Sequence, residues 1–251
     1  MARIEKRQRQ KEQRRLKIEA EIRAWNVRRR RRLAITLAPL ALLGAATAVL
    51  IVRSMTKPEP SNIACGGAKP TRPSIAPVSE APALSINQAK TYTASIQTSC
   101  GTITLALEDD RQPVTVNSFV YLARRHFFDG LTFHRVVEGF AVQGGDPKGD
   151  GTGGPGYSVT ETPSADTKYL KGTVAMAKSQ DEAPGTSGSQ FFIVPGTEAE
   201  QQLGPDYSVL GHVVSGADVL DKIQGVGTGT GANSEKPSKT IYIDRISIAE
   251  S

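Results

Sequence analysis

A run of twenty residues without a charged side chain divides this chain: residues 33–52, LAITLAPLALLGAATAVLIV. As a helix rising about 1.5 Å per residue, the run would be roughly 30 Å long, which is the thickness of the hydrocarbon core of a bilayer. A core helix of a globular domain would have a polar face, and this run offers only Thr36 and Thr47. A cleaved signal peptide would need small residues at the cleavage site, which Arg-Ser-Met at 53–55 lacks. We therefore predict an uncleaved transmembrane anchor.

The positive charge of the chain is concentrated before this anchor. Residues 1–32 hold 14 Lys or Arg against 4 Glu, a net charge of +10, so the chain total of +6 leaves −4 for residues 33–251. Basic residues next to the anchor predict a cytoplasmic tail at 1–32 and place residues 53–251 outside the cytoplasm. We interpret the tail as a solvated helix, although its basic side could lie on anionic lipid with Trp25 at the headgroups. Because the main domain is negative, we do not expect it to bind nucleic acid.

Residues 53–90 are rich in proline, serine, alanine and glycine and have little apolar periodicity. We expect an extracytoplasmic linker, semi-extended where proline dominates. Residues 91–251 remain, and they are enough for one domain with a substantial core.

Alternating and β-rich segments predict that this domain is mainly β. Strands are expected at about 92–98, 102–107, 131–137, 139–143, 172–177, 190–195, 207–214 and 240–248. One helix is expected to begin at Pro113, where the missing N–H costs least, and a second to cover about 216–224. Their apolar faces would be formed by Val116, Phe119, Val120 and Ala123, and by Val219, Leu220 and Ile223. Many antiparallel strands with two helices favour a closed barrel whose open ends the helices cover, since closure removes exposed edges.

The segment 133–147, FHRVVEGFAVQGGDP, places an arginine, an aromatic residue and an amide close together. Side chains on a strand alternate between faces, so Arg135 and Val137 share one face. A second strand from Phe140 to Gln143 can bring its side chains beside Arg135. The surface would be apolar, with one cation and one amide and no hydroxyl, thiol or carboxylate as a nucleophile. Such a site suits chemistry that breaks no covalent bond.

Four sequence blocks follow one another in the domain: FHRVVEGFAVQGGDP (133–147), GTGGPGY (151–157), GTVAMA (172–177) and GSQFFI (188–193). Together they resemble the cyclophilins, the peptidyl-prolyl cis-trans isomerases that cyclosporin inhibits. The resemblance covers residues 91–249, and the layout is similar to that of membrane-anchored bacterial members. It implies an eight-stranded antiparallel closed β-barrel capped by two α-helices. It also implies an enzyme that isomerises Xaa-Pro bonds of exported or cell-envelope proteins without a cofactor or metal.

The resemblance carries roles to residues of this chain. The implied catalytic residues are Arg135, Phe140 and Gln143. The implied substrate-binding residues are Ala141, Gly151, Ala177, Lys178, Gln190, Phe192, Leu203 and Tyr207. Phe140 and Phe192 would hold the proline ring. Of Gln143 and Gln190, one would hold Arg135 in place and the other would contact the peptide backbone.

A second pocket is implied beside Gly151. Ala177 and Lys178 align with the segment whose main chain pairs with the substrate. Lys178 stands where the family usually has Asn, but backbone groups are available from any residue. The loop 179–185 is about three residues longer than in the shorter cyclophilins.

The pocket departs from the animal-type pattern at three positions. Ala141 replaces the usual Met, which removes packing on the proline ring, and Tyr207 stands where His is common. Leu203 fits the pocket leucine. Gln202 falls where a Trp contacts cyclosporin in sensitive members, so a hydrogen bond and a large apolar contact to the drug should be lost. We expect weak cyclosporin binding and surviving isomerisation of small peptides.

The chemistry that the resemblance implies has a simple physical basis. Rotation about an Xaa-Pro bond faces a barrier of roughly 18–20 kcal/mol, because amide resonance is lost as the bond twists. The twisted form has a localised lone pair on the proline nitrogen. A guanidinium aimed at that nitrogen, as Arg135 would be, stabilises the twisted state more than the planar one. Its rigid fork of donors suits this task.

Other motifs in the domain give no support for a metal or nucleotide site. His126, His134 and His212 do not have the spacing of metal ligands, and we interpret His134 as a core histidine with satisfied hydrogen bonds. The sequence GDGTGG at 149–154 lacks the Gly-Lys-Ser/Thr ending and the following helix of a phosphate loop. We therefore expect no nucleotide.

Cys65 in the linker and Cys100 at the first hairpin are the two cysteines of the chain. In an oxidising extracytoplasmic compartment an even count favours a disulfide bond, which would join the linker to the barrel. Two free thiols are the alternative.

Two other functions stay open at this point. The barrel could bind proline-containing segments as a chaperone or scaffold with little turnover, which the departures at Ala141 and Gln202 favour. The basic tail could be the functional part, recruiting a cytoplasmic or lipid partner. The intact set of Arg135, Phe140 and Gln143 argues for the enzyme.

Overall fold

A computed structural model describes residues 62–76, 78–108, 110–229 and 235–251. The predicted tail, the predicted anchor and the first part of the linker lie outside the described residues. Within those ranges, no helix is long and apolar enough to cross a membrane. The anchor and the orientation of the chain therefore stay predictions from the sequence.

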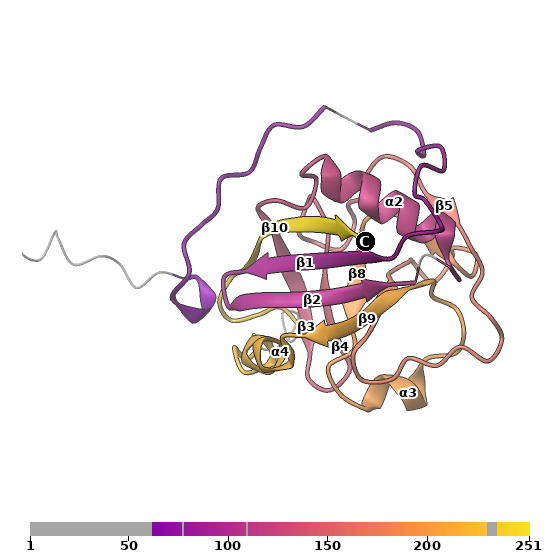
Figure 1. Cartoon of the computed structure of the whole chain (residues 1–251). Coiled ribbons are helices and arrows are strands. Elements are labelled where there is room, and N and C mark those ends of the chain that lie inside the picture. The colour runs from indigo at the N-terminus through magenta and orange to yellow at the C-terminus, as the bar shows by residue number, and fades with distance from the viewer. Residues whose placement is uncertain (1–61, 77, 109, 230–234) are drawn as a thin grey trace, which may run out of the picture. The chain divides into compact units, whose positions relative to one another are not determined.

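Eight strands close into an antiparallel barrel (Figure 1). The strands are β1 (Tyr92–Thr98), β2 (Gly101–Leu107), β3 (Leu131–Val137), β4 (Ala141–Gly144), β6 (Thr173–Met176), β8 (Phe191–Ile193), β9 (Val209–Ser215) and β10 (Ile241–Glu250). Around the barrel the order is β1-β10-β3-β4-β8-β6-β9-β2. Each predicted strand is present with ends within two residues of the expected ones. The prediction of an eight-stranded, closed, antiparallel barrel is confirmed.

Two helices pack on the barrel where the apolar periodicity predicts them. Helix α2 (Pro113–Arg124) begins with its proline in the first turn and buries the predicted face of Val116, Phe119, Val120 and Ala123. Helix α4 (Ala217–Gln224) buries Val219, Leu220 and Ile223. Its N-cap, Gly216, has φ of +91°, and a Cβ there would lie 2.4 Å from the carbonyl oxygen of Thr102. Only glycine fits this close approach to β2.

Four short elements were not predicted. Strands β5 (Val159–Thr160) and β7 (Thr186–Ser187) form a separate two-stranded sheet, and α3 (Glu198–Gln202) and the 3₁₀ turn η1 (Ala64–Gly66) complete the set. A strand of two residues has no periodicity to detect. Its formation depends on contacts that only the folded barrel provides.

The main core of the barrel is centred on aromatic rings. Phe119 of α2 lies 5.0 Å from Phe128 and 5.9 Å from Phe191, measured between ring centroids. Phe133 meets Phe191 edge-on at 6.1 Å. Edge-to-face packing of this kind is favourable for aromatic rings. Phe133 and Phe191 thus belong to the core, while their neighbours along the strands face the other way.

Residues 62–76 and 78–90 form what we call the strap, which contacts the barrel at several points. Figure 1 shows this segment running as an open arc from η1 to the side of α2. At its start, the N–H of Ala64 donates to the carbonyl of Thr240, next to β10, at 2.9 Å. In the middle, Nη1 of Arg72 donates to the carbonyl of Pro147 at 3.0 Å. The part of the linker that the structure describes is therefore tied to the domain at several points.

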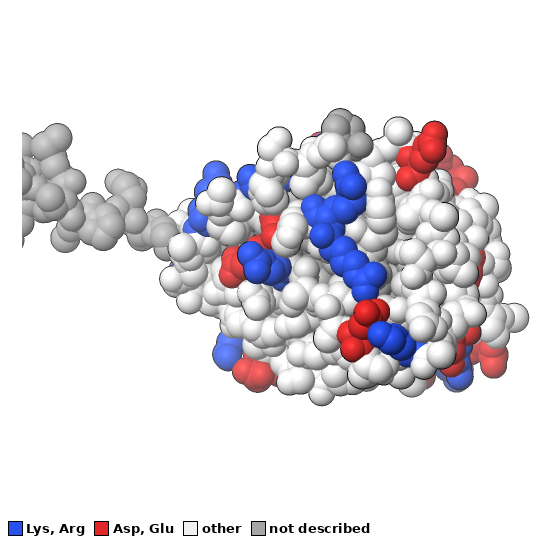
Figure 2. Space-filling model, turned by 45° about the horizontal axis from the view of Figure 1, so that its top comes forward, with Lys and Arg blue, Asp and Glu red and all other residues white. Residues whose placement is uncertain are grey.

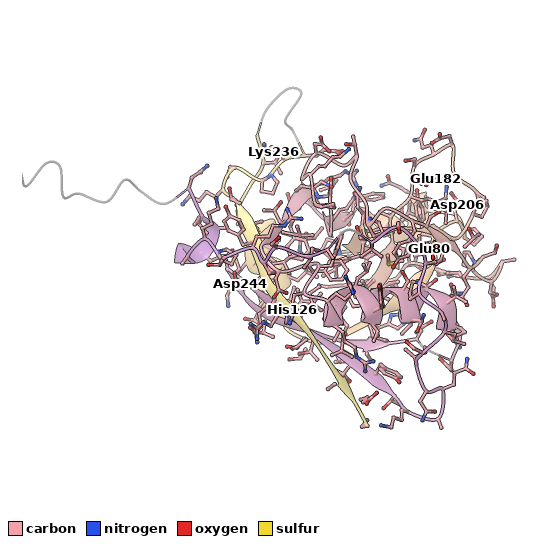
Figure 3. All side chains as sticks on the ribbon, turned by 90° about the horizontal axis from the view of Figure 1, so that it is seen from above. Glu80, His126, Glu182, Asp206, Lys236 and Asp244 are labelled. Atoms are coloured by element: carbon pink, nitrogen blue, oxygen red, sulfur yellow. A yellow bond between two sulfur atoms is a disulfide. The ribbon has the colours of Figure 1, made fainter. Side chains whose placement is uncertain are left out.

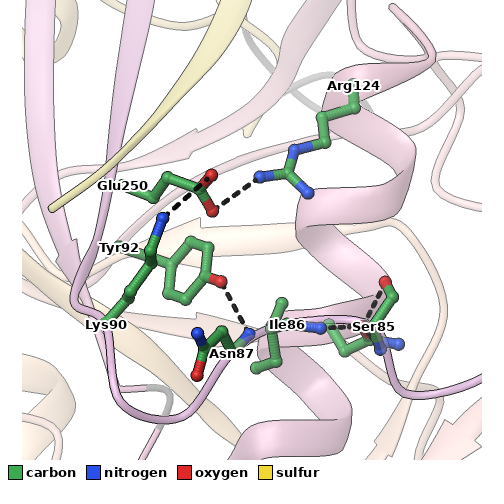
Figure 4. A network of polar contacts seen from close by, with 8 residues as sticks. Ser85, Ile86, Asn87, Lys90, Tyr92, Arg124 and Glu250 are labelled. Carbon is green, nitrogen blue, oxygen red and sulfur yellow. Dashed lines mark hydrogen bonds and ion pairs between the residues drawn. The ribbon is translucent and has the colours of Figure 1, made fainter.

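The end of the strap is fixed to α2 and β10 by a polar network (Figure 4). Buried Asn117 of α2 accepts hydrogen bonds from the N–H groups of Ser85 and Ile86 at 2.8 and 3.2 Å. These hydrogen bonds satisfy the side-chain oxygen of Asn117, which would otherwise be buried without a partner at a cost in free energy. Nearby, Glu250 pairs with Lys90 and Arg124 at 3.5 and 3.3 Å.

Charged side chains of both signs share the surface of the domain. Figure 2 shows Lys and Arg side chains in a narrow diagonal line on one face, and the line ends against acidic side chains. Exposed pairs such as Lys222 with Asp218, at 2.8 Å, are screened by water and add little to stability. The stability of the fold therefore depends mainly on the core and on the attachment of the strap.

The structure joins Cys65 of η1 to Cys100, in the turn between β1 and β2, by a disulfide bond. We predict that replacing both cysteines by serine lowers the free energy of unfolding by about 2–4 kcal/mol, because the bond closes a loop of 35 residues that the unfolded chain would otherwise explore. Urea unfolding of the purified chain measures this change. The wild-type chain under reducing conditions should match the double variant, and equal stability of both proteins without reductant would contradict the prediction.

Candidate functional site

Strand pairing places several predicted site residues in one row across the barrel wall. Arg135 on β3 pairs with Gln143 on β4, which pairs in turn with Phe192 on β8. Phe192 pairs with Ala175 on β6. Directly paired residues of antiparallel strands point to the same face of a sheet. A cation, an amide and an aromatic ring therefore lie side by side on one face.

The guanidinium of Arg135 is held on two sides. Nη1 donates to Oε1 of Gln143 at 3.4 Å. Nε and Nη2 donate to the carboxylate of Glu235 at 2.6 and 3.3 Å. Cζ lies 5.8 Å from the centroid of the Phe140 ring, within the range of a cation–π contact. Since the side chain is 31% exposed, a ligand can reach the cation.

Apolar side chains form what we call the slot, next to Arg135. Its members are Phe140, Ala141, Phe192, Leu203 and Tyr207, all within one hydrophobic cluster that is separate from the main core. Ala141 and Phe192 are buried, and the other three are partly exposed. The Phe192 ring meets the Tyr207 ring edge-on at 5.4 Å. These five side chains thus form an apolar, partly aromatic surface beside Arg135.

Tyr169, which the sequence analysis did not identify, holds one wall of the slot. It is completely buried, and its hydroxyl donates to the carbonyl of Tyr207 at 2.7 Å and accepts from the N–H of Tyr207 at 2.8 Å. Burial raises the pKa of Tyr169, so the hydroxyl stays neutral and can act as both donor and acceptor. Tyr169 lies in an irregular segment with no strand or helix pattern. No local signal marked it.

A chain of amides extends from Arg135 to a neighbouring loop. Nε2 of Gln143 donates to Oε1 of Gln190 at 3.0 Å. Nε2 of Gln190 donates to the carbonyls of Gly151 and Gly153 at 2.9 and 2.8 Å. Gln143 is therefore oriented with its oxygen toward Arg135, and Gln190 engages the loop.

The side chain of Asp146 fixes the loop 148–153, and the sequence alone did not point to this residue. Its buried carboxylate accepts from the N–H groups of Lys148, Asp150 and Gly151 at 2.7, 3.0 and 2.6 Å. Burial tends to raise the pKa of Asp146, but the backbone donors outweigh burial and keep the pKa below its usual value. The carboxylate stays ionised and holds the loop in one conformation. A Cβ on Gly153 would lie 2.0 Å from Oδ1 of Asp146, which explains the glycine.

A cavity of about 630 Å³ adjoins the slot. Five of the predicted site residues line it: Gln143, Gly151, Ala177, Lys178 and Gln190. Gln143 contacts Arg135, so it belongs to both halves of the site. The predicted residues thus divide into a slot and a neighbouring cavity, with Arg135 and Gln143 between them.

The ammonium of Lys178 is turned into the protein. Only 3% of its side chain is exposed, and Nζ lies 2.7 Å from Oδ2 of Asp206. Nζ also donates to the carbonyls of Ser179 and Glu182 at 3.2 and 3.0 Å, and lies 5.6 Å from the centre of the Tyr207 ring. Figure 3 shows Glu182 and Asp206 near each other on this side of the domain. The side chain of Lys178 therefore closes the longer loop 179–185 onto the site.

The interpretation of His134 as a satisfied core histidine is wrong. The residue is only partly buried, and neither ring nitrogen has a hydrogen-bond partner among the described residues. Burial, opposed by Asp146, lowers the pKa of His134. The register between β3 and β4 shifts between Phe133 and Arg135, so His134 lies at an irregularity where the alternation of the strand is interrupted.

The comparisons with known proteins agree with this arrangement. A protein-family model described as "Cyclophilin type peptidyl-prolyl cis-trans isomerase/CLD" matches residues 93–248. "Probable peptidyl-prolyl cis-trans isomerase B" of Mycobacterium tuberculosis is 40% identical over 168 residues, which cover 61% of this chain and 53% of that protein. "Peptidyl-prolyl cis-trans isomerase" of Helicobacter pylori is 41% identical over 143 residues, covering 54% of this chain and 82% of that protein. The chain spans about half the length of the mycobacterial isomerase B proteins that it matches.

A solved structure has the same fold. The cyclophilin-type peptidyl-prolyl cis-trans isomerase of Cryptosporidium parvum, crystallised in the presence of the dipeptide Ala-Pro, matches with a TM-score of 0.57 and 29% sequence identity. The match covers 63% of this chain and 99% of that one.

We predict that Lys178→Met loosens the loop 179–185 while the barrel stays folded. The loop loses two hydrogen bonds from the ammonium to the carbonyls of Ser179 and Glu182, each of which contributes about 0.5–1.5 kcal/mol net. Hydrogen exchange should show the amides of the loop exchanging about tenfold faster or more, since 1.4 kcal/mol corresponds to a factor of ten. Lys171→Met, at an exposed position, is the matched control and should change no amide of the loop. Unchanged protection in Lys178→Met would show that the ammonium does not hold the loop.

Proposed function

This chain belongs to the cyclophilin-type peptidyl-prolyl cis-trans isomerase family, and from this premise we propose that its barrel accelerates rotation about Xaa-Pro peptide bonds without covalent chemistry. The observation that carries the proposal is the position of Arg135. Its guanidinium is accessible, it is oriented by Gln143, and it lies at the edge of an apolar slot with Phe140 and Phe192 in its walls.

The proposed mechanism uses the slot and the cation together. The slot holds the proline ring by burying its apolar surface, so the ring stays still while the preceding carbonyl rotates. As the bond twists, the lone pair of the proline nitrogen becomes localised and can accept a hydrogen bond from Arg135. This bond is available in the twisted state and not in the planar one, so it lowers the barrier rather than only tightening binding.

The neighbouring cavity would take residues that precede the proline. Ala177 and Lys178 line this cavity, and their backbone groups would pair with an extended peptide. The ammonium of Lys178 is occupied by Asp206 and two carbonyls, so we assign the binding role of this residue to its backbone. The Ala-Pro dipeptide present with the Cryptosporidium parvum relative supports a small proline-containing ligand for this site.

We propose exported or cell-envelope proteins as the substrates. Two features support this placement: the uncharged run at residues 33–52, preceded by a strongly basic tail, and the disulfide bond between Cys65 and Cys100. Structural disulfides persist in oxidising compartments outside the cytoplasm. Free thiols at both cysteines in protein taken directly from cells would contradict the placement.

The competing function is a proline-binding module with little turnover. Ala141 favours it, because a small side chain packs less on a proline ring than the usual Met would. The two functions differ in one measurement. Exchange between the cis and trans signals of an Xaa-Pro tetrapeptide, followed by NMR, speeds up only if the chain is an isomerase.

We predict that the purified full chain accelerates this exchange and that Arg135→Ala reduces the acceleration about 100-fold. Removal of one donor aimed at developing charge typically costs a factor of this size. Arg135→Lys keeps the charge but loses the planar fork of donors. Its acceleration of exchange should lie between that of the wild-type chain and that of Arg135→Ala. Arg245→Ala on β10, outside the site, is the control and should keep full activity. A wild-type chain that binds the peptide without speeding exchange would support the binding module instead.

We also predict that cyclosporin inhibits this activity weakly. Gln202 ends α3 and is exposed next to Leu203 of the slot, so it offers the drug neither the ring surface nor the N–H of a tryptophan. Gln202→Trp should lower the inhibitory concentration at least tenfold, while peptide exchange without the drug stays unchanged. Inhibition of the wild-type chain at nanomolar drug would contradict this prediction.

A further inference from the structure

A hairpin that follows α4 brings a carboxylate to Arg135. Thr228 pairs with Pro237, and the N–H of Gly229 donates to the carbonyl of Lys236 at 2.9 Å. The N–H of Val136 on β3 donates to the carbonyl of Glu235 at 2.7 Å. The backbone thus attaches Glu235 to the strand that carries Arg135. In Figure 3 the next residue, Lys236, lies at the other end of the domain from Glu182 and Asp206.

The side chain of Glu235 binds one edge of the guanidinium. Oε2 accepts from Nε of Arg135 at 2.6 Å, and Oε1 accepts from Nη2 at 3.3 Å. With the bond from Nη1 to Gln143, described residues engage three of the five N–H groups. No described residue engages the other two N–H groups, which we assign to a substrate. The side chain of Glu235 is 54% exposed, so it reaches Arg135 from the solvent side.

We propose that Glu235 is a positioning residue for isomerisation: its carboxylate fixes the rotation of the Arg135 guanidinium so that the remaining donors face the slot. The inference rests on the proposed function, because it assigns the donors of Arg135 to the twisted imide. Two parallel bonds define both the place and the plane of a guanidinium, which a single contact cannot do. The bond to Gln143 is long, and the ring of Phe140 restrains Arg135 only loosely.

The exposure of the pair decides what kind of effect to expect. Ion pairs at this level of exposure contribute little to stability, so the effect of Glu235 should appear in the reaction rather than in unfolding. Pre-ordering a donor saves the cost of ordering it in the transition state. The hydrogen bond from Arg135 lowers the pKa of Glu235, so the carboxylate is ionised at neutral pH.

A purely structural role for the side chain is a weaker explanation. The hairpin is closed by backbone bonds of Gly229, Lys236 and Ser238, and it is tied to β3 by the backbone carbonyl of Glu235. The hydroxyl of Ser238 also donates to the carbonyl of Val226 at 2.7 Å. None of these bonds uses the carboxylate. Glu235→Gln, which keeps the shape of the side chain, should therefore leave the hairpin in place.

The test compares Glu235→Gln with the wild-type full chain by two measurements. The first is the NMR signal of the Arg135 Nε–H group, identified by its loss in Arg135→Lys; it should shift and exchange faster with water in Glu235→Gln. The second is the kinetics of peptide exchange. We expect kcat to fall two- to fivefold, with KM changed less than twofold, because the contact orders a group used in the transition state. Glu138→Gln, on the exposed turn after β3, is the matched control and should change neither.

The outcomes separate this inference from the proposed function. An unchanged Nε–H signal would show that the carboxylate does not hold Arg135. A shifted signal with unchanged or increased kcat would show that the contact exists but does not assist the reaction. Either result overturns the role of Glu235 while isomerisation stands. If the wild-type chain does not accelerate exchange, the proposed function fails and this inference fails with it, even where the signal responds.

Discussion

The antiparallel register of β3, β4 and β8 is the constraint on which the rest of the site depends. It sets Arg135 beside Gln143 and Gln143 beside Phe192, and it turns all three to one face of the barrel. A shift of β3 by one residue would send the cation into the core, and a shift of β4 or β8 would do the same to Gln143 or Phe192. Because these three strands belong to a closed barrel, each of them is paired on both sides within the part of the chain that the structure describes, which leaves no edge along which such a shift could begin.

This rigid wall leaves the loops to shape the rest of the site, and buried polar groups hold those loops. Asp146 binds the loop 148–153 through backbone N–H groups, and Tyr169 binds both backbone groups of Tyr207. Each is a buried group whose hydrogen bonds go to the main chain, so each fixes conformation rather than adding apolar contact. A non-covalent catalyst needs such fixed loops, since its only means of action is the placement of groups around the twisting bond.

Sequence reasoning predicted the barrel and most of the site because both are encoded locally. Alternation gave the eight strands, proline and apolar spacing gave α2, and the family blocks pointed to Arg135 and the slot. Residues that act through long-range contacts left no local pattern: Tyr169 lies in irregular chain, and Glu235 is separated from Arg135 by 100 positions. The prediction that His134 is a satisfied core histidine was wrong for a related reason. The strand that carries it was correctly predicted, but the register shift beside it and the partners of its nitrogens depend on chain segments folded elsewhere.

Lys178 shows how one departure from the family pattern connects the two halves of the site. Its ammonium is bound by carbonyls of the loop that borders the cavity, and by Asp206 and the ring of Tyr207 on the side of the slot. A neutral asparagine, shorter by two bonds, could not reach all of these groups. Carbonyls of the longer loop 179–185 accept from the ammonium, and the carboxylate of Asp206 balances the charge of this buried cation. The lysine, the aspartate and the extended loop therefore act together as one structural unit.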